Sequence, residues 1–86
     1  MVSLDRVDKV IRKLKGKTMG RNKLGDYMFK RGFLLEDVVY KSNVEDSFIF
    51  YRVHEGMYEY VTIDIHAISW NIIRITGSSV RRDING

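Results

Sequence analysis

The chain has 86 residues, of which 44% are hydrophobic and 30% are charged, and its net charge is +4. A chain of this size and composition is expected to fold as one domain, residues 1–86, rather than to stay disordered. It contains no cysteine, which excludes disulfides and cysteine-ligated metals, and no apolar run approaches the roughly 20 residues that span a membrane. We therefore expect a cytoplasmic protein with no membrane partner.

The first predicted element is a helix that begins after Ser3. Ser3 is a good N-cap, because its hydroxyl oxygen accepts a hydrogen bond from a free backbone N–H. Apolar residues then recur at helical spacing, at Leu4, Val7, Ile11 and Leu14. Gly16 suits the left-handed position that commonly ends a helix.

Residues 16–22 are predicted to form a loop, and residues 23–31 a second helix that ends at Gly32. Leu24, Tyr27 and Met28 line one side of this helix. Gly25 inside it costs about 1 kcal/mol relative to alanine.

Residues 35–41 allow two interpretations. Val38, Val39 and Tyr40 favour a strand, whereas the Glu36–Asp37 pair is typical of a helix start. We expect a strand. The alternative is a winged helix, with helices in residues 24–41 and a wing in residues 48–65. Its groove-entering helix should be basic or polar, but this segment is acidic and apolar, which argues against the alternative.

Strands are predicted at residues 48–53, 58–66 and 71–76, and residues 77–86 are expected to be a loosely held tail. A two-residue turn at Glu55-Gly56 joins the first two strands, since glycine readily adopts positive φ. This turn sets Arg52 opposite Glu59, as an ion pair at the rim of the sheet.

The hairpin register divides the side chains between two faces. One face is expected to form the core and carries Phe48, Phe50, Val61, Ile63 and Ile65. The other is aromatic with polar tips and includes Tyr51, Tyr58 and Tyr60. The predicted fold is therefore α+β, with two N-terminal helices packed on one face of a three- to four-stranded antiparallel sheet.

No catalytic motif in the sequence is complete. Gly16-Lys17-Thr18 resembles part of a phosphate-binding loop, but Ile11 stands where that loop needs a glycine. Asp64 and His66 share a strand face and could orient an imidazole as a base, yet no nucleophile is placed beside them. Since no spacing fixes a metal site either, we expect a non-enzyme without cofactor or metal.

Charge is distributed unevenly along the chain. Residues 1–31 hold ten basic and three acidic side chains, a net charge of +7, whereas residues 32–86 hold five basic and eight acidic ones, a net charge of −3. A basic surface attracts polyanions, although it also serves simply to keep a protein in solution. We predict a small non-catalytic nucleic-acid-binding accessory or regulatory protein. The predicted contact residues are Arg12, Lys13, Lys15, Lys17, Arg21 and Lys23.

A second hypothesis is a protein-interaction module, such as an inhibitor or adaptor, that binds another protein or a second copy of itself. Tyrosine is favoured at interfaces, and an exposed sheet edge invites pairing. The predicted contact residues in this case are Tyr51, Tyr58 and Tyr60.

Overall fold

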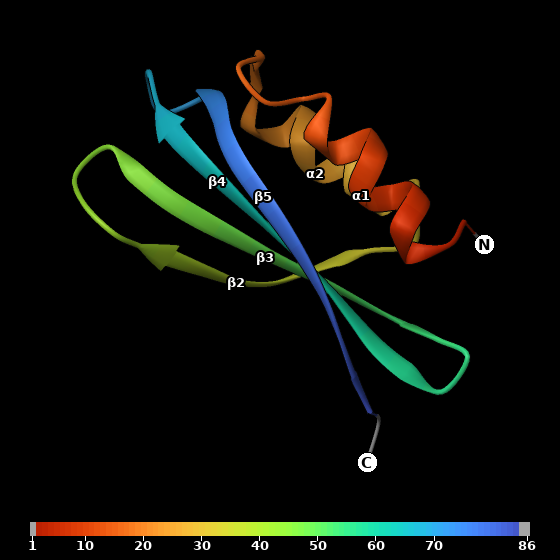
Figure 1. The fold of residues 1–86 in the computed structure, drawn as a ribbon. Coiled ribbons are helices and arrows are strands. Elements are labelled where there is room, and N and C mark those ends of the chain that lie inside the picture. The colour runs from red at the N-terminus through yellow and green to blue at the C-terminus, as the bar shows by residue number, and fades with distance from the viewer. Residues whose placement is uncertain (1, 85–86) are drawn as a thin grey trace.

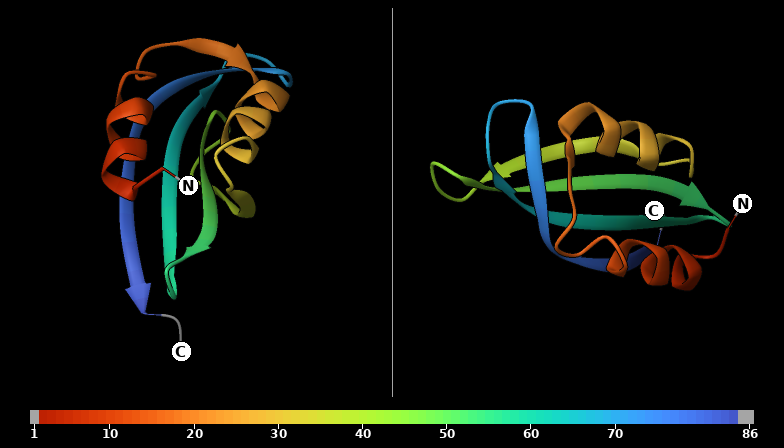
Figure 2. Two further views of the ribbon diagram at one scale, coloured as in Figure 1. Left: turned by 90° about the vertical axis from the view of Figure 1, so that its right-hand side faces the viewer. Right: turned by 90° about the horizontal axis from the view of Figure 1, so that it is seen from above.

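The structure is a computed structural model that describes residues 2–84, and it contains two helices and one five-stranded sheet. In chain order the elements are α1 (Leu4–Arg12), β1 (Thr18–Gly20), α2 (Arg21–Phe29), β2 (Leu34–Tyr40), β3 (Glu45–His54), β4 (Met57–Ala67) and β5 (Ile72–Ile84). The sheet is antiparallel throughout in the order β1-β5-β4-β3-β2, and both helices pack on one face of it (Figure 1, Figure 2). The α+β class is confirmed, whereas the predicted number of strands is too low.

The capping of α1 agrees with the prediction. The hydroxyl oxygen of Ser3 accepts a hydrogen bond from the backbone N–H of Arg6 at 3.3 Å. The predicted apolar stripe is buried or half-buried at Leu4, Val7, Ile11 and Leu14. The chain leaves the helix through turns that end at Gly16, where φ is +84°.

Helix α2 begins and ends two residues earlier than predicted. It starts at Arg21 because β1 leads into it directly, with Gly20 at the cap position. Leu24 and Met28 are buried, as their spacing predicts. After Phe29 the chain turns through Gly32, whose φ is +86°.

Two predictions of irregular structure are wrong. The predicted loop of residues 16–22 contains β1, which pairs with β5 from Thr18↔Arg74 to Gly20↔Ile72. Most of the predicted tail of residues 77–86 continues β5, which pairs with β4 as far as Ile84; residues 85–86 lie outside the described residues. In both places hydrogen bonds to a neighbouring strand order a backbone whose own side chains lack a clear strand pattern.

The β3–β4 hairpin has the predicted register, with His54 opposite Met57. Glu55 and Gly56 both have positive φ, 53° and 76°, as a primed two-residue turn requires. The predicted core face is buried at Phe48, Phe50, Val61, Ile63 and Ile65. The assignment of the two sheet faces is therefore confirmed.

The Arg52–Glu59 pair is buried and not at the rim as predicted. Both side chains are 1% exposed, and Arg52 Nε donates to Glu59 Oε1 at 2.7 Å. The ring of Phe33 lies under the Arg52 guanidinium, and Arg82 of β5 donates to the second oxygen of Glu59 at 3.1 Å. The pair is covered by Phe33 and by the extension of β5, neither of which the sequence pattern predicted.

The winged-helix alternative is wrong, because residues 34–40 form a strand. Strand β2 pairs with β3 along its length, with a bulge between Leu35 and Asp37. The β-branched Val38 and Val39 decide the local structure, and the bulge accommodates Glu36 between them and Leu35.

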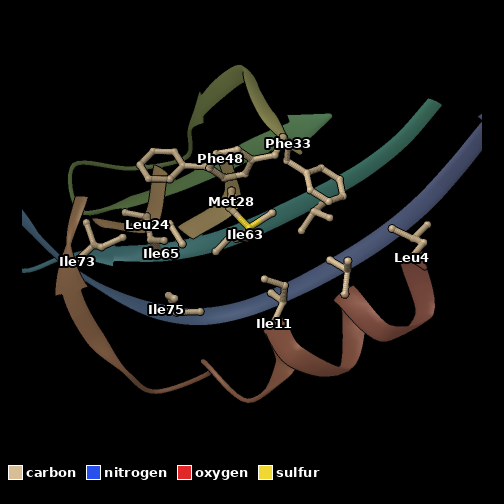
Figure 3. Packing of buried hydrophobic residues seen from close by; sticks show 13 residues of the cluster. Leu4, Ile11, Leu24, Met28, Phe33, Phe48, Ile63, Ile65, Ile73 and Ile75 are labelled. Atoms are coloured by element: carbon tan, nitrogen blue, oxygen red, sulfur yellow. The ribbon is translucent and has the colours of Figure 1, made fainter. Parts of the chain in front are cut away.

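The core lies between the helices and the covered face of the sheet (Figure 3). Figure 3 shows Ile11 of α1 beside β5, and Leu24 and Met28 of α2 closer to β3 and β4. The opposite face of the sheet carries no helix among residues 2–84 (Figure 2). The same residues contain no helix long and apolar enough to cross a membrane.

Candidate functional site

The six predicted basic residues follow one short stretch of chain, which we call the basic segment, residues 12–23. Arg12 ends α1, Lys13 caps it, and Arg21 begins α2. Five of the six side chains are exposed to solvent, at Arg12, Lys13, Lys15, Lys17 and Lys23. Figure 1 shows that the segment passes over the end of the sheet opposite the β3–β4 hairpin.

Backbone bonds to β5 fix the shape of the basic segment. The N–H of Gly16 donates to the carbonyl of Ile75 at 2.7 Å, and the N–H of Ile75 donates to the carbonyl of Lys17 at 2.9 Å. Lys17 also donates its N–H to the carbonyl of Leu14 at 2.9 Å. Lys15 and Lys17 therefore project from an ordered backbone.

The structure brings Arg12 and Lys15 to one hollow of about 410 Å³, which Gly77 and Ser78 of β5 line from the other side. Arg12 is also paired with Asp8 of the same helix, with Nε 3.1 Å from Oδ2. Since the Arg12 side chain is 72% exposed, this ion pair is weak and leaves the guanidinium open to a stronger anion. The two cations on one side of the hollow suit contact with a phosphate group.

Arg21 differs from the other five basic residues because it is half-buried and held at several points. Its Nε donates to the carbonyl of Trp70 at 3.1 Å, and a terminal nitrogen lies 3.9 Å from Asp46 Oδ2. Its guanidinium carbon is 5.3 Å from the ring centroid of Phe48 and 5.4 Å from that of Trp70. Arg21 thus links α2 to the β4–β5 turn.

Sequence reasoning missed Trp70, the single tryptophan of the chain. It lies in the β4–β5 turn and is 81% exposed. The neighbouring residues could have indicated its exposure, since Ser69 and Asn71 on either side are typical of turns. A tryptophan in such a turn has no strand face on which to be buried.

The three predicted interface tyrosines lie on the helix-free face of the sheet and are half-buried. The rings of Tyr58 and Tyr60 lie 6.3 Å apart, and the Arg81 guanidinium lies 4.4 Å above the Tyr60 ring. Partial removal from water raises the pKa of Tyr60, and the carboxylates of Glu36 and Asp83 act in the same direction. This face therefore combines aromatic rings with nearby negative charge.

Asp64 and His66 share the helix-free face, as their spacing predicts. Asp64 Oδ1 accepts hydrogen bonds from the Ser47 hydroxyl at 2.5 Å and from Lys41 Nζ at 3.2 Å. These bonds, that from Ser47 above all, hold the pKa of the Asp64 carboxyl below its ordinary value. Its contacts are thus to a hydroxyl of β3 and to the ammonium of Lys41, which follows β2, and such contacts suit a structural role.

Within residues 2–84 no group of three or more His, Cys, Asp or Glu side chains is arranged to hold a metal ion. Comparison with protein-family models, with curated proteins and with solved structures finds no significant match to this chain.

Proposed function

We propose that this protein binds nucleic acid, without catalysis, through the basic segment, in an accessory or regulatory role. The observation that carries the proposal is the set of five exposed cations within twelve residues, on a backbone ordered by β5. Phosphate contacts require a density of positive charge at the surface and give affinity without sequence specificity. An ordered backbone lowers the entropy that such contacts cost.

The charge of the remaining surface supports the same location. Glu36 and Asp83 act on Tyr60 from the helix-free face of the sheet. The Arg81 guanidinium offsets part of this negative charge, but residues 32–86 still carry a net charge of −3, whereas residues 1–31 carry +7. The basic segment is therefore the favoured side for a polyanion.

The test compares two double variants that each remove two positive charges. In the first, Lys15→Gln and Lys17→Gln lie in the basic segment; in the control, Lys30→Gln and Arg81→Gln lie outside it. Binding to dye-labelled oligonucleotides is measured by fluorescence anisotropy at low salt. We expect the first variant to lose about tenfold or more in affinity and the control to lose less, because only the first loses phosphate contacts. Equal losses would contradict the proposal.

A second candidate function, a protein-interaction module, is favoured by the free edge of β2. Four large apolar side chains of this strand are exposed, at Leu34, Leu35, Val39 and Tyr40. A hollow of about 590 Å³ between α2 and β2 has an apolar floor that includes Val38, Phe48 and Phe50. Such an edge favours pairing with another strand, and the half-buried tyrosines offer further contact area.

This second candidate predicts association that depends on β2 and on the tyrosines. Leu35→Lys and Tyr60→Ala should each shift a self-associated form towards the monomer in sedimentation analysis. A protein that sediments as a monomer at all concentrations would remove the dimeric form of this candidate.

A further inference from the structure

Two exposed aromatic side chains share one hollow at the end of the sheet where the basic segment passes. Trp70 in the β4–β5 turn is 81% exposed, and Tyr40 at the end of β2 is 75% exposed, the two highest values among the large apolar side chains of residues 2–83. Both line a hollow of about 340 Å³, which we call the aromatic hollow. Two large rings left in water beside one concave site indicate a ligand rather than a packing role.

The turn that carries Trp70 is ordered before any ligand arrives. The N–H of Ile68 donates to the carbonyl of Ile72 at 2.9 Å, and the N–H of Arg21 donates to the carbonyl of Asn71 at 2.7 Å. The Arg21 side chain adds a bond to the Trp70 carbonyl and lies over the indole ring. The backbone that carries the indole is therefore ordered, which lowers the entropic cost of stacking a planar ligand on the ring.

The other wall of the aromatic hollow is ordered in the same way. The N–H of Lys41 donates to the carbonyl of Glu45 at 2.9 Å, which closes the β2–β3 turn. The N–H of Ala67 donates to the carbonyl of Val44 at 2.6 Å, which ties that turn to the end of β4. Tyr40 thus borders the hollow from the end of β2, next to this second ordered turn.

The lining beside the two rings is mostly polar, with one valine and one alanine as its apolar members. Asn43 supplies an amide, which donates and accepts hydrogen bonds. The hydroxyl oxygens of Ser42 and Ser69 accept backbone N–H bonds within their own turns, and each hydroxyl can still donate. The one carboxylate of the lining, Asp46, lies 3.9 Å from the Arg21 guanidinium, which offsets its charge. Aromatic side chains with polar groups in the same hollow match a nucleobase, which has a planar face for stacking and a hydrogen-bonding edge.

We propose that the aromatic hollow binds an unpaired base of a single-stranded nucleic acid, stacked on Trp70. The proposal rests on the function proposed above and names its substrate class. Arg21 of the basic segment itself lines the hollow, so a strand bound along the basic segment would pass beside the indole. A base within a duplex is already stacked and paired, and it does not enter such a site without being unpaired first.

Trp70 itself reports on the proposed contact, because it is the single tryptophan in the chain. The probes are a 20-nucleotide oligodeoxythymidylate, an abasic strand with the same number of phosphates, and a duplex of the same length. We expect the oligodeoxythymidylate to quench the tryptophan fluorescence, and the abasic strand and the duplex to bind with little quenching. Binding of all three probes without quenching would overturn the stacking inference and leave the proposed function intact. Failure of all three to bind at low salt would contradict the proposed function itself.

Variants separate stacking from charge. Trp70→Ala should weaken binding of the oligodeoxythymidylate about 5- to 150-fold, the range that corresponds to base–aromatic stacking, and should leave the abasic strand unaffected. Trp70→Phe should recover part of the loss, since it keeps a ring. The matched control is Phe29→Ala, which removes an aromatic side chain that is 66% exposed on α2 and does not line the aromatic hollow. If Trp70→Ala binds the oligodeoxythymidylate as tightly as Phe29→Ala does, the hollow serves another partner, such as a protein, and the inference is wrong.

Discussion

Substitution of Glu59 by glutamine tests the buried ion cluster that joins β3, β4 and β5. Glu59 Oε1 accepts from Arg52 Nε at 2.7 Å, and Oε2 lies 3.0 Å from a terminal nitrogen of Arg82. The amide of the introduced glutamine keeps the shape of the side chain but removes its charge. Arg52 then stays in the interior with no carboxylate beside it, and its remaining hydrogen-bond acceptors there include the carbonyls of Arg31 and Val2.

Breaking a buried pair on one side costs about 3–5 kcal/mol, because it leaves an uncompensated buried charge. The free energy of unfolding of an 86-residue domain is expected to be about 4–13 kcal/mol, so Glu59→Gln should remove a large share of this stability. The control is Asp83→Asn, which breaks the exposed Arg81–Asp83 pair and should cost less than about 1 kcal/mol. Urea unfolding followed by circular dichroism measures both. If Glu59→Gln costs no more than the control, the cluster does not hold the three strands together.

Three further outcomes follow from the same structure. Burial raises the pKa of Glu59, but the hydrogen bonds from Arg52 and Arg82 outweigh burial and hold this pKa below its ordinary value of 4.5. The pKa of Asp64 is also lowered. The two carboxylates therefore contribute fully to stability above the pKa values that they have in the unfolded chain. This contribution is lost as the pH falls through their lower pKa values in the folded protein. Between about pH 6 and about pH 2, the unfolding free energy of Glu59→Gln should therefore decline less steeply than that of the unmodified protein. Phe50→Ala should cost about 3–5 kcal/mol because the ring is 3% exposed, and Tyr58→Ala on the helix-free face should cost less than half as much; equal losses would contradict the assignment of the two faces. Gly25→Ala in α2 should stabilise the protein by about 0.4–1 kcal/mol, since nothing lies within 4 Å of the added methyl group. Gly56→Ala should destabilise the protein, because φ at this position is +76°. If the two substitutions shift the melting temperature in the same direction, this reasoning is wrong.

The elements that the sequence predicted well are those with strong local patterns. The stripe of α1 and the alternation of β3 and β4 each bury one face, and the Glu55-Gly56 turn accepts one register only. From these features the core face of the sheet follows residue by residue.

The elements that were missed depend on partners distant in the sequence. Residues 18–20 and 77–84 carry few apolar side chains, and they are strands because β5 and β4 lie beside them. The burial of Arg52 likewise depends on Phe33, which crosses beneath its guanidinium. Local propensity contains no information about such neighbours.

The candidate site also has one part that the sequence predicts and one part that depends on the folded structure. Charge counting located the basic segment, because a cluster of cations is visible in the sequence. Charge alone does not distinguish Arg21 from the other five cations, although the folded chain places the Arg21 guanidinium against Phe48 and Trp70. The aromatic hollow joins the start of α2, the β2–β3 and β4–β5 turns and the strand ends beside them, so no spacing along the chain could predict it.

The salt dependence of binding tests the central claim most directly. Four phosphates neutralised on a single strand give a slope of about −2.8 for log K against log salt, and loss of two contacts in the Lys15→Gln, Lys17→Gln variant reduces it to about −1.4. Anisotropy titrations of the oligodeoxythymidylate at five or more salt concentrations measure both slopes, and the Lys30→Gln, Arg81→Gln control should keep the slope of the unmodified protein. A slope near zero, or one that the Lys15→Gln, Lys17→Gln variant leaves unchanged, would contradict the assignment of the basic segment as a nucleic-acid interface.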